Sequence, residues 1–224
     1  MTTALIDQTL GQLASSIPGA SRIFHSFKLD FCCGGNTSLR EAAATMGLDA
    51  GLIADALQAL VAQPGDEPDW RKVQAGELIE HILARYHERH RDQFPELIRL
   101  ARRVEQVHGN RPECPNGLAE HLWTMQQELE SHMLKEEQVL FPMLLRGIPV
   151  TQVQGPISVM RLEHDHHGAA LAKLAALTQD ITPPAQACNT WRALYRGLEE
   201  LRSDLMQHIH LENNILFAGG TLQA

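Results

Sequence analysis

The chain has 224 residues, a net charge of −8 and 44% hydrophobic residues, which is an ordinary composition for a folded protein. An acidic chain without a separate Lys/Arg cluster argues against nucleic acid as a partner, and no apolar run is long enough to span a membrane. The first residues lack a basic segment followed by an apolar core, and the four cysteines do not form a disulfide framework. We therefore expect a cytoplasmic protein that binds neither nucleic acid nor membrane.

Short helical patterns fill the first part of the chain, over about residues 8–62. They are interrupted by a tight turn, Asp30-Phe-Cys-Cys-Gly-Gly35, and two of them begin after the capping residues Ser38 and Asp49. The sequence predicts a small N-terminal helical domain over residues 1–62.

The next segment is rich in turn-forming and charged residues, beginning Gln63-Pro-Gly-Asp-Glu-Pro-Asp69. We expect a linker over residues 63–74.

Helical periodicity then continues without a β-alternating run, in four long segments. Glycine and proline separate the segments, which cover about residues 75–108, 116–145, 156–180 and 185–217. Four helices with short connections predict an antiparallel four-helix bundle over residues 75–220, and hence an all-α fold.

Two of these segments carry a histidine four residues before a glutamate, in His132-Met-Leu-Lys-Glu136 and His208-Ile-His-Leu-Glu212. With roughly 3.6 residues per turn, positions i and i+4 lie on one face of a helix, and here that face is otherwise lined with leucine. A buried carboxylate without a partner is too costly to keep charged. Two such pairs on inward faces therefore indicate a bound cation, and more than one.

The other two long segments also carry histidines on their apolar faces. Periodicity points both His87 and His90 inward in the first, and both His164 and His167 in the third. Each helix of the predicted bundle thus brings at least one imidazole to its interior. Spacing alone does not choose between the histidines within each pair.

Iron suits mixed imidazole and carboxylate ligation, and two carboxylates can bridge two metals held roughly 3.5–4 Å apart. With two histidines per metal and one bridging solvent oxygen, each iron keeps a position for dioxygen or nitric oxide. The zinc-protease signature fails, because His87-Glu-Arg-His90 is one residue too short. A ferritin-like site would show Glu-x-x-His motifs, which run in the opposite order.

Several motifs in order give the chain a specific resemblance: Asp30-Phe-Cys-Cys-Gly-Gly35, Arg85-Tyr-His-Glu-Arg-His-Arg91, Ser131-His-Met-Leu-Lys-Glu-Glu137, Gly155-Pro-Ile-Ser-Val-Met160, Glu163-His-Asp165 and His208-Ile-His-Leu-Glu-Asn-Asn214. Over nearly its full length the chain resembles the Repair of Iron Centres family, the YtfE/ScdA type of di-iron iron–sulfur cluster repair protein with a hemerythrin-like domain.

The resemblance implies two iron ions in an oxo- and carboxylate-bridged, non-haem di-iron centre. Matched by motif, the implied ligands are His87, His132, Glu136, His164, His208 and Glu212. The extra imidazoles of His90, His167 and His210 leave substitution for an assigned ligand open.

The implied function is repair of iron–sulfur clusters damaged by nitrosative or oxidative stress, through donation of iron from a labile centre. The implied partners are damaged iron–sulfur proteins and small gases such as nitric oxide or dioxygen, and a homodimer is left open. Two alternatives stand beside repair: a hemerythrin-like nitric oxide or dioxygen binding or sensing protein, and a nitric oxide reductase. We expect a repair protein rather than an enzyme, with nitric oxide reduction as a side activity at most.

Adjacent cysteines, Cys32 and Cys33, cannot easily form a disulfide with each other because the geometry is strained. One interpretation makes them small buried residues beside a Gly-Gly turn. The other makes them thiolates that accept iron or nitric oxide, or that contact a client protein. The sequence leaves both open.

Overall fold

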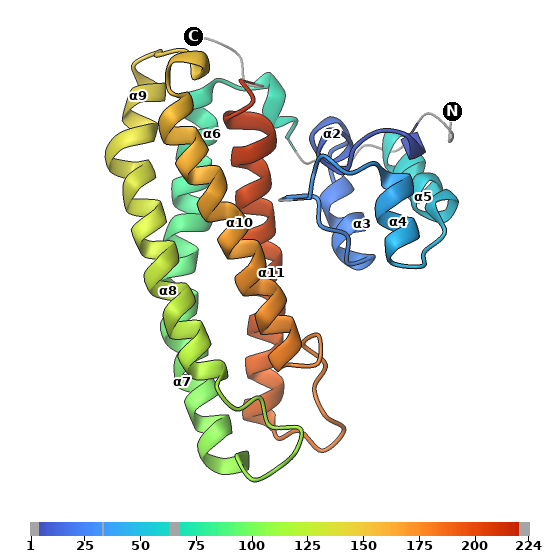
Figure 1. Cartoon of the computed structure of the whole chain (residues 1–224), viewed down its shortest axis with the longest axis vertical. Coiled ribbons are helices and arrows are strands. Elements are labelled where there is room, and N and C mark those ends of the chain that lie inside the picture. The colour runs from blue at the N-terminus through green and yellow to red at the C-terminus, as the bar shows by residue number, and fades with distance from the viewer. Residues whose placement is uncertain (1–4, 33, 63–67, 220–224) are drawn as a thin grey trace. The chain divides into compact units, whose positions relative to one another are not determined.

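The computed structural model describes residues 5–32, 34–62 and 68–219, which contain helices and no β-strand (Figure 1). The predicted all-α fold is therefore confirmed. The chain divides into two compact units, the first made of residues 1–79, 147–152 and 206–224 and the second of residues 80–146 and 153–205. The domain limits expected from the sequence stay a prediction, and residues 63–67 of the expected linker lie outside the described residues.

Short helices form the N-terminal part of the first unit: α2 (Leu10–Ser16), α3 (Ala20–Ser26), α4 (Leu39–Thr45) and α5 (Ala50–Ala62). Ser38 forms a capping box with Glu41, and Asp49 Oδ1 accepts a hydrogen bond of 2.8 Å from Gly51 N. Both residues satisfy backbone N–H groups that a helix start leaves unpaired. The capping roles predicted for them are confirmed.

An apolar core holds these short helices together. Leu13, Phe24 and Leu57 are fully buried within it, and Met206, near the end of the last long helix, packs against it. The core of the first unit therefore combines residues from both ends of the chain.

Long helices build the second unit: α7 (Glu88–His108), α8 (Leu118–Lys135), α10 (Gln154–Leu177) and, as far as Leu205, α11 (Asn189–Leu211). Short elements extend them, namely α6 (Ala75–Ile82) with η2 (Leu83–His87) before α7, and η3 (Glu136–Leu140) with α9 (Phe141–Leu145) after α8. Successive long helices run in opposite directions (Figure 1). The segments agree with the predicted antiparallel bundle to within a few residues at each end.

Smaller elements complete the described chain: η1 (Trp70–Lys72), η4 (Val150–Gln152) and η5 (Glu212–Leu216). In the described ranges, no helix combines the length and the apolar character that a bilayer crossing requires.

Candidate metal centre

Glu136 is the centre of a buried polar cluster in the second unit. Its carboxylate oxygen Oε2 lies 3.5 Å from Nε2 of His87 on η2 and 3.5 Å from Nε2 of His132 on α8. His164, on α10, places its Nε2 3.0 Å from Nε2 of His132. All four side chains are at most 1% exposed. Elements η2, α8 and α10 thus each bring an imidazole nitrogen close to the carboxylate of Glu136.

The donor set of this cluster fits a metal cation. One ligand atom each from His132, Glu136 and His164 lie within 4.8 Å of one another. A buried carboxylate is unfavourable unless a positive charge compensates it. Imidazole and carboxylate together are typical ligands of iron and zinc.

The first unit carries a second pair of the same kind. His208, in the last turn of α11, lies 3.1 Å through Nε2 from Oε1 of Glu212, the first residue of η5, and both side chains are fully buried. The pair repeats the four-residue spacing of His132 and Glu136. It also continues the buried stripe of Leu198, Leu201 and Leu205 along α11 at spacings of three and four.

Among the described residues, three helical turns are π-helical, and each adjoins a predicted ligand. η2 ends at His87, η3 begins at Glu136, and η5 begins at Glu212. A π turn contains one extra residue and is often found at functional sites, because it changes which side chains face the core. Nothing in the sequence pattern indicated these turns.

Two further carboxylates lie on the far side of the histidine rings. Glu137 Oε1 is 2.8 Å from Nδ1 of His87, and Glu163 Oε2 is 3.0 Å from Nδ1 of His132. Arg91 binds Glu137 at 2.9 Å, and Lys135 forms an ion pair with Glu163. Carboxylates in this position commonly orient metal-binding histidines. Sequence reasoning missed both, although each is next in the chain to a predicted ligand.

The histidines that periodicity could not exclude have other surroundings. His90 is buried, and its Nδ1 lies 3.2 Å from Gln93 Oε1. His167 packs edge-on against the His132 ring with 5.0 Å between ring centroids. Neither joins a group of potential metal ligands among the described residues.

His210 belongs to the interior of the first unit. Its ring meets the Phe31 ring edge-on at 5.5 Å, and its Nδ1 accepts a hydrogen bond of 3.0 Å from Asn214 Nδ2. Burial lowers the pKa of His210 to about 4, so the ring is neutral at pH 7.

The cysteine turn is organised by Asp30. Its Oδ1 accepts hydrogen bonds from Cys32 N at 3.1 Å and from Cys32 Sγ at 3.3 Å, and its Oδ2 accepts one from Gly34 N at 3.0 Å. Cys32 is 4% exposed, and Cys33 lies outside the described residues. The turn therefore buries the one thiol that can be placed.

Two asparagines that follow Glu212 bind this turn within the first unit. Asn213 Nδ2 donates to the carbonyl of Cys32 at 3.3 Å, and Asn214 Nδ2 donates to that of Phe31 at 3.3 Å. The approach is close: a Cβ atom at Gly11 would lie 2.7 Å from Asn214 Oδ1. The cysteine turn and the η5 turn thus form one packed assembly.

Comparison with known protein families identifies the class of protein to which the chain belongs. The family model described as the hemerythrin HHE cation binding domain matches residues 78–218, and the chain belongs to this family. The model ScdA_N, described as a domain of unknown function, matches residues 6–61.

Relatives that align with almost the whole chain carry the name of one kind of protein. The chain is 52% identical over 211 residues to the iron-sulfur cluster repair protein YtfE of Dickeya chrysanthemi, covering 94% of this chain and 95% of the relative. Proteins of the same name from Escherichia coli O81 and Yersinia pseudotuberculosis are each 51% identical over the same shares of the two chains. The family resemblance drawn from the motifs is confirmed.

Proposed function

We propose that this protein repairs iron–sulfur clusters damaged by nitrosative or oxidative stress, by donating iron from a non-haem di-iron centre. The buried cluster around Glu136 carries the proposal, because its imidazole and carboxylate donors lie close enough together to hold a metal ion. The relatives named for iron–sulfur cluster repair supply the biological context.

The proposed ligands are His87, His132, Glu136, His164, His208 and Glu212. The first four meet in the second unit. His208 and Glu212 are included because they continue the buried face of α11 beyond Leu205 and repeat the spacing of His132 and Glu136. The two glutamates would bridge the metals, and they supply the negative charge that offsets part of the charge of two cations.

The chain's own groups explain why iron held here could be given away. Imidazole nitrogens and carboxylates bind iron, but thiolates are the ligands that iron–sulfur clusters select. Glu137 and Glu163 accept hydrogen bonds from Nδ1 of His87 and His132, which leaves the Nε2 lone pairs directed at Glu136. When bound, the di-iron centre would supply transferable iron and positions for small ligands. Transfer to a thiolate-rich acceptor is then favourable.

We further propose specific partners and a cellular location for the protein. Nitric oxide and dioxygen are the small molecules that such a centre would meet, and damaged iron–sulfur proteins are the clients. A cytoplasmic setting and self-association into a homodimer complete the proposal. Nitric oxide reduction is an alternative activity, which N₂O formation with an electron donor would reveal.

Metal analysis with an activity assay tests the main proposal. Purified protein loaded with Fe(II) should retain two irons per chain and show near-ultraviolet absorption of an oxo-bridged ferric pair after oxidation. Added to a dehydratase whose cluster has been damaged by nitric oxide, it should restore activity while losing iron. One tightly held zinc and no iron after reconstitution would contradict the assignment.

A further inference from the structure

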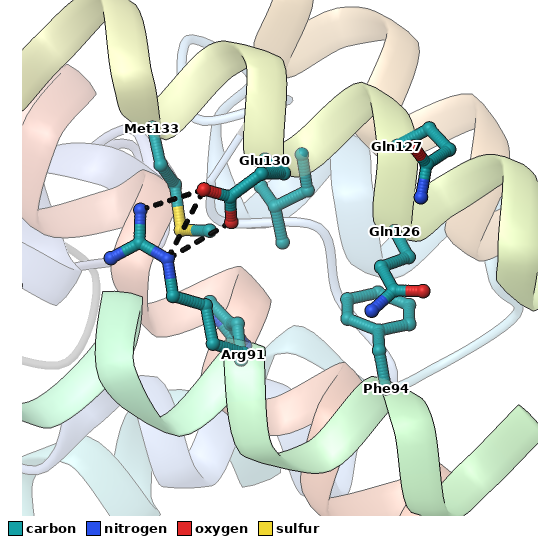
Figure 2. A pocket seen from close by; sticks show the side chains of 8 residues that line it. Arg91, Phe94, Gln126, Gln127, Glu130 and Met133 are labelled. Carbon is teal, nitrogen blue, oxygen red and sulfur yellow. Dashed lines mark hydrogen bonds and ion pairs between the residues drawn. The ribbon is translucent and has the colours of Figure 1, made fainter.

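A chain of four side chains runs from the surface of the second unit to a proposed ligand. Arg91, on α7, reaches across to Glu130 on α8, with Nε–Oε2 at 2.9 Å and Nη2–Oε1 at 3.0 Å (Figure 2). The same guanidinium binds Glu137 Oε1 at 2.9 Å, and that oxygen lies 2.8 Å from His87 Nδ1. The order is therefore Glu130, Arg91, Glu137 and His87.

The last contact decides how the His87 ring presents its nitrogens. A carboxylate only accepts hydrogen bonds, so His87 Nδ1 carries the proton. The lone pair is then on Nε2, which faces Glu136 Oε2 at 3.5 Å. A ring in the other tautomer would present an N–H group to the metal position and could not bind a cation there.

Arg91 decides whether Glu137 stays in place. The Glu137 side chain is 24% exposed, so alone it could turn toward solvent. Arg91 binds the same Glu137 oxygen, Oε1, that contacts His87 Nδ1, and Glu130 fixes Arg91 in turn through three hydrogen bonds. A planar guanidinium bound to two carboxylates loses little freedom on forming each bond.

We infer that Glu137 and Arg91 are positioning residues for His87, and that this relay sets how long the protein retains iron. The inference rests on the proposed function for the identity of the metal. Partners of this kind typically alter metal affinity by about 10- to 100-fold.

The relay is also open to its surroundings. A pocket of about 300 Å³ lies beside the Arg91–Glu130 pair, with Phe94, Leu129 and Met133 among its walls (Figure 2). Solvent can therefore reach the outer end of the relay without entering the buried cluster. Because solvent reaches Arg91 and Glu130, their contacts can break and re-form more easily than those of a fully buried pair, which suits a site that must release iron.

The first test is Glu137→Gln, with Glu96→Gln as the matched control. Glu96 also pairs with an arginine, Arg99, but on the exposed side of α7. Both proteins are loaded with Fe(II), and loss of iron to a coloured Fe(II) chelator is followed. We expect Glu137→Gln to take up two irons and to lose them at least 10-fold faster than the unchanged protein. Glu96→Gln should stay within twofold.

The second test asks whether Arg91 acts through Glu137. Arg91→Gln should lose iron about three- to tenfold faster, Arg91→Lys by less, and Arg99→Gln should match the unchanged protein. If the relay is real, the double variant Arg91→Gln with Glu137→Gln should be no faster than Glu137→Gln alone. Independent, multiplying effects would overturn the relay.

Thermal unfolding of the iron-free proteins separates positioning from general damage. Iron-free Glu137→Gln should melt within a few degrees of the iron-free unchanged protein. After iron loading and oxidation, the near-ultraviolet absorption band of Glu137→Gln should shift. Iron loss within twofold of the control in both Glu137→Gln and Arg91→Gln would overturn the inference while leaving the proposed function intact. An unchanged protein that holds no iron would instead refute the proposed function. If Glu137→Gln does not fold, the variants of Arg91, whose side chain is 35% exposed, decide the question.

Discussion

The first unit packs Leu13, Phe24 and Leu57 into an apolar centre, whereas the second unit encloses three imidazoles around the carboxylate of Glu136. Burial of apolar area stabilises a fold whether or not a metal ion is bound. Burial of a carboxylate among imidazoles is unfavourable unless a positive charge compensates it, and a bound metal ion supplies that charge. The comparison teaches that the apolar centre around Leu13 is an unconditional core, whereas the polar cluster around Glu136, set among apolar side chains of the second unit, is a conditional one.

The largest effect is expected when the carboxylate at the centre of the conditional core is replaced by an apolar side chain. Glu136→Leu should lose nearly all bound iron, because its carboxylate oxygen Oε2 faces Nε2 of both His87 and His132. The iron-free variant should be as stable as the unchanged iron-free protein, or more stable by about 1–4 kcal/mol. Iron content per chain and denaturant unfolding measure the two effects.

His90→Gln and His167→Gln are the controls for that experiment, with Glu212→Leu as the parallel case. The two histidines are buried but lie outside the groups of potential ligands, so these variants should retain most of their iron. Equal iron loss in all four variants would mean that the wrong inward residues were chosen.

The next largest effect is expected on the thermal stability of the unchanged protein when its iron is removed. A ligand at 1,000 times its dissociation constant stabilises the folded state by about 4 kcal/mol. For a chain of this size that corresponds to roughly 8–16 °C in the unfolding midpoint. Calorimetry with and without iron checks it, and Glu136→Leu should show little difference between the two states. Coincident midpoints for the unchanged protein would remove the distinction between the cores.

A smaller effect should follow from a change in the apolar core. Ile53 is fully buried there, so Ile53→Val should cost about 0.5–1.5 kcal/mol. The loss should be the same in iron-loaded and iron-free protein, because Ile53 belongs to the unconditional core. Urea unfolding of both forms provides the measurement, and a loss seen only in the loaded form would contradict the comparison.

The smallest effect on iron content is expected from the cysteine turn. Cys32→Ser with Cys33→Ser should leave two irons bound, since Cys32 Sγ is hydrogen-bonded to Asp30. Repair of a nitrosylated dehydratase should nevertheless weaken if the thiols receive iron or contact the client. Cys188→Ser, which removes an exposed thiol, is the control. Lost iron would place the cysteines at the metal, and undiminished repair would make them structural.

Sequence periodicity predicted the helices and the facing of His132 and Glu136, because residues four apart share one face of a helix. It could not separate His87 from His90, since both lie on the same stripe and only their neighbours differ. Glu137 was missed for a related reason. It follows Glu136 directly and so points elsewhere around the helix, and its value depends on Arg91 from another helix. The π turns depend on packing, which local composition does not reveal.

The close approach of Asn214 to Gly11 has a practical consequence for dissecting the protein. A fragment beginning near residue 75 would keep Asn213, Asn214 and His210 but discard Phe31 and Cys32, to which they are joined. It would also uncover Met206, which packs on the discarded core. Truncation would therefore mix loss of the thiols with damage to the end of α11. Point substitutions in the whole chain are the cleaner way to assign a task to each half.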